Sequence, residues 1–277
     1  PGVGHAGMGR SSNPALCPQG LHRPPIALSV ATGEGAGLVY YRPMPATHRQ
    51  LVHELRFTCV PSGAHIAWAR SGRLGAPVLL RAAHWMTHIE YDLRSPLWRP
   101  LIEQLGRQLE VVRYDERGCG LSTADDVPLG LETLVEELEA VTEAHGAKTF
   151  ALLGISGGVG AAVAYAVRHP ERVSHLVLLA GCTHGLLHRN PSPEALAFHE
   201  AQLKLIELGW GRKDPGVQNM FTSRFMPDGN MEQIASFNEH QRLSCDGLRA
   251  AAIVRARAAQ DVRQLVGALR VPTLVLH

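Results

Sequence analysis

The residues best suited to chemistry in this chain are the five that run Gly154-Ile155-Ser156-Gly157-Gly158. They follow an apolar stretch, 150–153, and precede small residues with helical spacing, 158–167. A serine between two glycines at such a junction predicts a strained strand-to-helix turn that exposes its hydroxyl as a nucleophile. Glycine is expected two residues to either side because the strand and the helix come too close there for bulky side chains.

The backbone after Ser156 supplies a second element of this chemistry. The following helix would point its positive N-terminus toward the serine. The backbone N–H of Gly157 is therefore a candidate to stabilise a developing oxyanion. A nucleophilic serine beside such a donor indicates acyl transfer through a covalent intermediate.

Other interpretations of the glycine-rich turn fit less well. One alternative is a glycine-rich strand-to-helix turn with an incidental serine, but the serine stands directly after a strand and before a helix, where the nucleophile motif requires it. A dinucleotide-binding fingerprint needs glycines at relative positions one, three and six, and no register of residues 154–160 supplies them. A phosphate-binding loop needs Gly-Lys followed by Ser or Thr, and the sequence lacks this run.

The composition is typical of a soluble globular protein. The 277 residues are 45% hydrophobic and 19% charged, and the formal net charge is +2. Without a basic stripe, nucleic acid is not an expected partner. No apolar run is long enough to span a bilayer and no signal-peptide pattern opens the chain, so no membrane partner and a cytoplasmic location are expected.

The cysteines indicate neither a disulfide framework nor a zinc site. Their number is odd and no two form a CxxC pair: Cys17, Cys59, Cys119, Cys182 and Cys245. Reduced thiols fit this pattern best, and we expect Cys59 and Cys182 to be buried as small hydrophobic residues. No metal and no cofactor are expected.

The spacing of apolar residues predicts the elements that position the serine. Strands are expected at 55–60, 65–70, 77–80, 109–114, 150–153, 173–180 and 271–276, with helices at 96–107, from 131 to a stop at Gly146, and at 158–167. The alternation of strand and helix predicts an α/β fold, with a mostly parallel sheet and helices on both faces.

Two parts of the chain differ from this pattern. Residues 1–50 are rich in Gly, Pro, Ser and His, and we expect a disordered or poorly ordered extension with one short extended piece at 37–41. Residues 51–277 are expected to form one domain. Within it, residues 183–268 carry helical patterns broken by prolines, which we interpret as a helical cap over the site.

From about residue 55 onward the chain resembles the α/β-hydrolase superfamily. The resemblance rests on five segments in order, 84–92, 112–122, 152–158, 169–178 and 271–277. It looks most like bacterial hydrolase domains found alone or beside adenylate cyclase and transcriptional-regulator modules. The resemblance implies an α/β-hydrolase fold and a serine hydrolase that forms an acyl-enzyme at Ser156 with a small-molecule ester or related acyl substrate.

The resemblance also implies roles near the serine. The loop after the third strand of the core supplies a second oxyanion N–H, which falls at Ala83-His84-Trp85, with Trp85 the better candidate. Residues 115–122 match a loop that braces the site from below. Asp115 and Arg117 are therefore interpreted as a structural pair that orders the loop.

Histidines also fall near the expected carboxyl ends of the strands. His84, His88 and His184 occupy such positions, and we interpret each as an ordinary polar loop residue.

In this superfamily the triad follows the chain order serine, acid, histidine. The acid follows the strand that 271–276 resembles and the histidine comes one strand later, so both are expected beyond His277. The chain is thus expected to be truncated relative to the fold and to turn over esters negligibly, because a serine without a base is a poor nucleophile. A non-catalytic ligand-sensing module stays open as the alternative.

The strand at 271–276 would leave an unpaired edge through which chains could self-associate.

Overall fold

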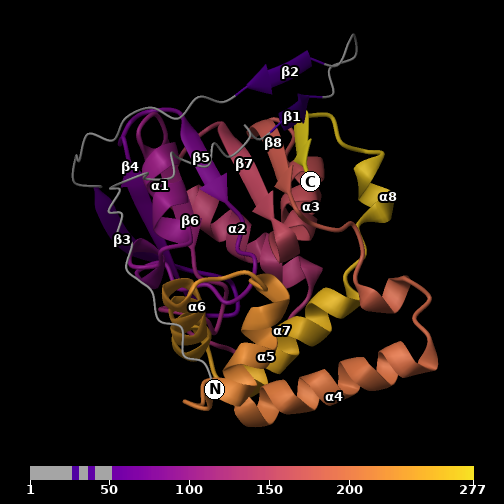
Figure 1. Ribbon diagram of the computed structural model, residues 1–277. Coiled ribbons are helices and arrows are strands. Elements are labelled where there is room, and N and C mark those ends of the chain that lie inside the picture. The colour runs from indigo at the N-terminus through magenta and orange to yellow at the C-terminus, as the bar shows by residue number, and fades with distance from the viewer. Residues whose placement is uncertain (1–26, 31–36, 41–51) are drawn as a thin grey trace, which may run out of the picture.

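The computed structural model describes residues 27–30, 37–40 and 52–277 (Figure 1). In the N-terminal part, β1 (Ala27–Val30) and β2 (Gly37–Tyr40) pair antiparallel, and β2 falls within the extended piece expected at 37–41. The remainder of the 1–50 extension lies outside the described residues, so its disorder stays a prediction.

A seven-stranded sheet forms the centre of the molecule, in the order β3-β4-β6-β5-β7-β8-β9. Its strands are β3 (His53–Cys59), β4 (His65–Gly72), β5 (Val78–Arg81), β6 (Glu110–Tyr114), β7 (Phe150–Ile155), β8 (Val173–Leu179) and β9 (Thr273–Leu276). β3 pairs antiparallel with β4 and β4 with β6, whereas every pairing from β6 to β9 is parallel. The predicted mostly parallel α/β sheet is confirmed.

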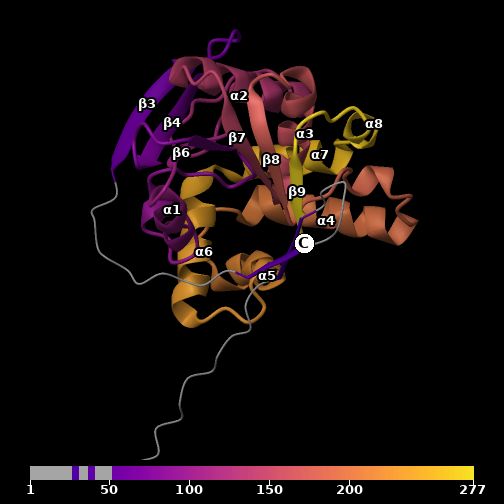
Figure 2. The ribbon, with the colours of Figure 1, turned by 90° about the horizontal axis from the view of Figure 1, so that it is seen from above.

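Helices cover both faces of the sheet (Figures 1 and 2). α2 (Leu131–His145), α3 (Val159–Arg168) and the short α8 (Arg263–Val266) pack on one face. α1 (Trp98–Gly106) packs on the other, over the central strands. α2 ends at Gly146, whose φ of +80° is the left-handed cap expected of a glycine there. Coverage on both faces explains why residues 150–155 form a nearly continuous apolar run.

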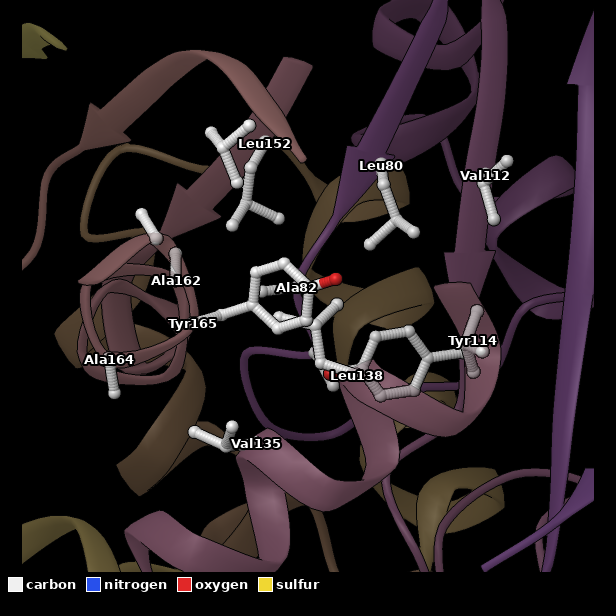
Figure 3. Close-up of a cluster of buried hydrophobic side chains, with 14 of the residues drawn as sticks. Leu80, Ala82, Val112, Tyr114, Val135, Leu138, Leu152, Ala162, Ala164 and Tyr165 are labelled. Atoms are coloured by element: carbon white, nitrogen blue, oxygen red, sulfur yellow. The ribbon is translucent and has the colours of Figure 1, made fainter. Parts of the chain in front are cut away.

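The main core lies between the sheet and the α2–α3 pair. Figure 3 shows Leu80 and Leu152 from the sheet pointing toward Leu138 of α2 and Tyr165 of α3. All four side chains are at most 1% exposed. α3 places small residues such as Ala162 against the sheet, so its backbone approaches the strands closely. This close packing of α3 on the sheet positions the N-terminus of the helix beneath Ser156.

The region 183–268 is helical, as its sequence pattern indicated. It contains α4 (Pro193–Gly209), α5 (Pro215–Phe225), α6 (Met231–Ser244), α7 (Gly247–Ala259) and α8. Its first four helices gather at one end of the sheet and share an apolar cluster that includes Leu203, Trp210, Phe221 and Phe237 (Figure 1). Met86, from the loop after β5, is buried in the same cluster. The helical layer is therefore fastened to the core through that loop.

β9 is the last strand of the sheet on its side, and its Val275 is 61% exposed. The proposed self-association through 271–276 remains a prediction. Among the described residues, no helix has both the length and the apolar character to cross a membrane.

The expected burial of two cysteines is wrong. Cys59 and Cys182 are both exposed, whereas Cys119 is buried. Cys59 ends β3, an edge strand, and Cys182 lies three residues beyond the end of β8, on the loop that leaves the sheet. An apolar local pattern identifies a strand, but it does not say whether another layer covers the end of that strand.

A buried ion-pair cluster joins the sheet to the segment before α1. Asp92 Oδ2 accepts hydrogen bonds from Arg81 Nη2 at 2.8 Å and Arg113 Nη1 at 2.6 Å, and all three side chains are at most 3% exposed. Burial alone would raise the pKa of Asp92, but the charges of the two arginines outweigh it and hold that pKa well below its usual value.

Asp92→Asn should destabilise the fold by about 3–5 kcal/mol, because it leaves two buried guanidinium groups without a counter-charge. The lowered pKa means that the carboxylate stabilises the folded state above its unfolded pKa of about 3.9 and that this contribution is lost as the pH falls. Urea unfolding at neutral pH measures the loss. Glu132→Gln is the matched control, because Glu132 pairs with Arg168 at the surface and should change stability by less than about 1 kcal/mol. Equal effects of the two variants would contradict this account.

Candidate functional site

Ser156 lies on the strained turn that the sequence predicts. β7 ends at Ile155, a 3-10 turn covers Ser156–Gly158 and α3 begins at Val159. Ser156 has a φ of +49°, a left-handed conformation that non-glycine residues rarely adopt, and its residue surface is exposed. The prediction of a strained strand-to-helix turn with an exposed serine is confirmed.

The glycines around Ser156 are required by close contacts. A Cβ on Gly154 would lie 2.9 Å from the Cβ of Ala162, and one on Gly158 would lie 2.8 Å from the carbonyl oxygen of Ala83. A Cβ on Gly157 would lie 2.7 Å from the carbonyl oxygen of His84. These separations are shorter than van der Waals contact, so strand, helix and the loop after β5 meet where only glycine fits.

Backbone strain gathers at this end of the sheet. Positive φ values occur at Met86 (+53°), Ser156 (+49°) and Ala180 (+47°), which follow the carboxyl ends of β5, β7 and β8. Ser156 and Ala180 line one cavity, and strained residues are typical of sites where geometry serves function. In open α/β sheets, ligands also bind outside the carboxyl ends of the strands.

A cavity of about 160 Å³ opens beside Ser156. The residues that line it come from the turn, from the loop after β8 and from the end of α7: Ser156, Gly157, Ala180, Gly181, Cys182, His184, Gly185, Arg189, Arg257 and Gln260. Sequence reasoning missed Arg189, Arg257 and Gln260. Nothing in the local pattern marks them, because their neighbours in the cavity lie far away along the chain.

Arg257 connects α7 to the loop after β5. Its Nε and Nη2 donate to the carbonyl oxygen of His84 at 3.3 and 3.0 Å. Its Nη2 also donates to Glu116 Oε2 at 2.8 Å, and Glu116 is almost completely buried. Because the His84 carbonyl and the Trp85 N–H belong to one planar peptide unit, Arg257 constrains the direction of that N–H.

The side chain of Trp85 does not line the cavity. Its ring lies 5.6 Å from the ring of Trp210 and 5.3 Å from that of Phe225, between ring centroids, within the helical layer. The N–H of Trp85 therefore remains the predicted second oxyanion donor, and the side chain anchors the loop that carries it.

Residues 115–116 brace the same loop from below, as the sequence analysis anticipated. Asp115 accepts backbone hydrogen bonds from Ile89 at 2.8 Å and Leu121 at 2.9 Å. The backbone N–H of Glu116 donates to Thr87 Oγ1 at 2.9 Å. Burial raises the pKa of Asp115 to about 7, although both hydrogen bonds favour the charged form.

Arg117 does not pair with Asp115, so the expected ion pair between these two residues is wrong. Arg117 instead bonds Glu137, Asp125 and Glu136 and ties the 115–122 loop to α2. Residues two apart in this turn point in different directions, and Asp115 is already satisfied by backbone N–H groups. Each residue orders the loop separately.

The imidazoles near the strand ends do not bond to the serine. His84 is buried, with its ring edge-on to Trp98, and burial lowers its pKa well below the usual value. His88 Nδ1 accepts from the backbone N–H of Tyr91, and His184 Nδ1 lies 3.0 Å from Thr183 Oγ1. Across 52–277, no histidine forms a hydrogen bond with Ser156. Among the described residues, no three His, Cys, Asp or Glu side chains lie close enough together to hold a metal ion.

Gly158→Ala should destabilise the protein by about 1–3 kcal/mol, because the new methyl group would force the loop after β5 away from the turn. Chemical unfolding measures the change. Gly267→Ala is the control: its φ is −67°, it has open space around its Cβ position, and it should be neutral or slightly stabilising. An unperturbed Gly158→Ala variant would show that the loop has more room than its contacts indicate.

Known proteins resemble this chain over its middle part. A family described as alpha/beta hydrolase fold matches residues 92–219. RutD of Caulobacter segnis, whose name describes a carbamate hydrolase, is 26% identical over 132 residues, which are 47% of this chain and 39% of that protein. A proline iminopeptidase of Lactobacillus helveticus is 34% identical over 139 residues, 46% of this chain and 45% of that protein. The chain thus matches less than half the length of these curated relatives.

Solved structures extend the likeness to most of the domain. An esterase from Exiguobacterium antarcticum superposes with a TM-score of 0.65 at 19% identity, covering 80% of each chain. At this identity the likeness shows the fold. The chain has the α/β-hydrolase fold, and its residues 92–219 match the family described as alpha/beta hydrolase fold.

Proposed function

We propose that the protein is a serine hydrolase that acts on a carboxylic ester or a related acyl substrate through an acyl-enzyme at Ser156. One observation carries the proposal: Ser156 is exposed, strained at φ +49° and placed at the wall of a cavity. A serine held in this way outside a sheet is the arrangement required for nucleophilic attack.

The proposed chemistry follows from the positions of the backbone groups. Ser156 Oγ attacks the substrate carbonyl carbon, and the carbonyl oxygen becomes an oxyanion. The N–H groups of Gly157 and Trp85 are the proposed donors to it. As the intermediate collapses, the bond to the alcohol oxygen breaks and that oxygen receives the proton that Ser156 Oγ lost. Water then hydrolyses the acyl-serine ester, which releases the acid and restores the serine hydroxyl.

Proton transfer is not accounted for by the described residues, because no imidazole among them bonds to Ser156. Oxyanion stabilisation and binding alone leave a residual acceleration of about 10³–10⁴ over water when triad members are missing. The same observation favours a second candidate, a ligand-sensing module that keeps the cavity and does without turnover.

A fluorophosphonate probe separates the two candidates, because serine attack on its phosphorus displaces fluoride and leaves a stable adduct. We expect one adduct per chain, on Ser156, formed about 10³-fold faster than on a free serine derivative. Intact-mass and peptide mass spectrometry measure it. Ser156→Ala should abolish it. Labelling of another residue, or none at Ser156, would favour the sensing module.

His184→Gln tests the imidazole that lines the same cavity. Labelling should be unchanged, because His184 Nδ1 is engaged with Thr183 Oγ1 instead of the serine. A loss of more than tenfold would instead identify His184 as the base.

A further inference from the structure

We propose that the cavity beside Ser156 binds a carboxylate, so that the substrate is an anionic acyl compound such as the monoester of a short dicarboxylic acid. That the bound anion is a substrate rests on the proposed function, whereas the anion site itself follows from the residues that line the cavity. That lining contains two arginines and a glutamine amide, and no aspartate or glutamate belongs to it.

The guanidinium group of Arg257 is fixed along one edge and open along the other. Nε and Nη2 hold the carbonyl oxygen of His84, and Nη2 also holds Glu116. Its Nη1 forms no hydrogen bond with any residue that the structure describes. Arg257 lies at the end of α7 and is only 14% exposed, so its geometry is largely set by the protein.

Arg189, an exposed residue on the loop after β8, repeats this arrangement in the same cavity lining. Its Nε and Nη2 donate to the carbonyl oxygen of His184 at 3.3 and 2.9 Å. Its Nη1 likewise has no partner in the described ranges, and Arg189 has no acidic partner there. A guanidinium that is already oriented loses little freedom on binding a carboxylate, which favours recognition of this planar anion.

Gln260 is a further polar residue of the same lining. Its Nε2 is shielded from solvent and has no hydrogen-bond partner among the described residues. It packs against Gly160, where a Cβ would collide with it. This nitrogen is shielded by Gly160 of α3, so the positive charge that favours a carboxylate comes from the two arginines.

The balance of charge and the size of the cavity define the ligand class. Glu116 lies behind Arg257 and offsets its charge, but Arg189 keeps its full charge beside the cavity. A volume near 160 Å³ suits a ligand of roughly benzene size. A short acyl chain that ends in a carboxylate fits both the charge and the volume of the cavity.

Binding to the Ser156→Ala variant tests the anion site without any turnover. Monomethyl succinate is the anionic probe and dimethyl succinate is its neutral counterpart, measured by titration calorimetry at neutral pH. We expect the anionic probe to bind at least about tenfold more tightly, because it gains charge-assisted hydrogen bonds. Arg189→Gln, added to Ser156→Ala, should remove most of this preference.

Arg255→Gln, likewise added to Ser156→Ala, is the matched control. Arg255 lies two residues before Arg257 on α7, but it pairs with Glu207 at the surface, so the preference should survive. Equal binding of the two probes, or a preference that Arg189→Gln leaves intact, would overturn the inference. A clear preference without any Ser156 adduct would keep the anion site and reject the hydrolase. An adduct without a preference would keep the hydrolase and reject the anion site.

Discussion

The close approach of β7, α3 and the loop after β5 is the constraint on which the rest of the site depends. At Gly154, Gly157 and Gly158 an added Cβ would come within 3.0 Å of another atom. Removing side chains there lets α3 begin directly under the end of β7. The backbone must then turn sharply, and Ser156 takes the strained conformation that exposes it. The strain is sustained by the buried core below, in which α3 packs against the sheet through its small residues.

The loop after β5 transmits this constraint to the helical layer. Its Met86 is buried among the apolar residues of that layer, and its His84 carbonyl is held by Arg257 of α7. Thr87 and Ile89, further along, are bonded to the 115–116 segment. Sheet, helical layer and candidate oxyanion donors are therefore fastened at one loop. Any movement of α7 would therefore shift the peptide unit that contains the His84 carbonyl and the Trp85 N–H.

The sequence alone predicted the elements and the serine, but not the cavity. Apolar periodicity and the glycine spacing are local, so they placed the strands, the helices and the Ser156 turn. Arg255 and Arg257 look alike along the chain, yet one pairs at the surface and the other lines the cavity. Their difference, like the exposure of Cys59, depends on which layer packs over a given face. Local patterns carry no information on that packing.

A carboxylate beside the reacting carbonyl would carry an electrostatic cost. Two unit negative charges about 6 Å apart repel by about 3 kcal/mol at an effective dielectric constant of 20. A hydrolase that bound an anionic acyl group would therefore slow its own oxyanion step unless fixed positive charge lay nearby. Arg257 is held on a backbone carbonyl and on Glu116, and Arg189 is held on a second backbone carbonyl. Such preorganised charge offsets the repulsion in the transition state as well as in the bound complex, because it needs no reorientation when the oxyanion forms.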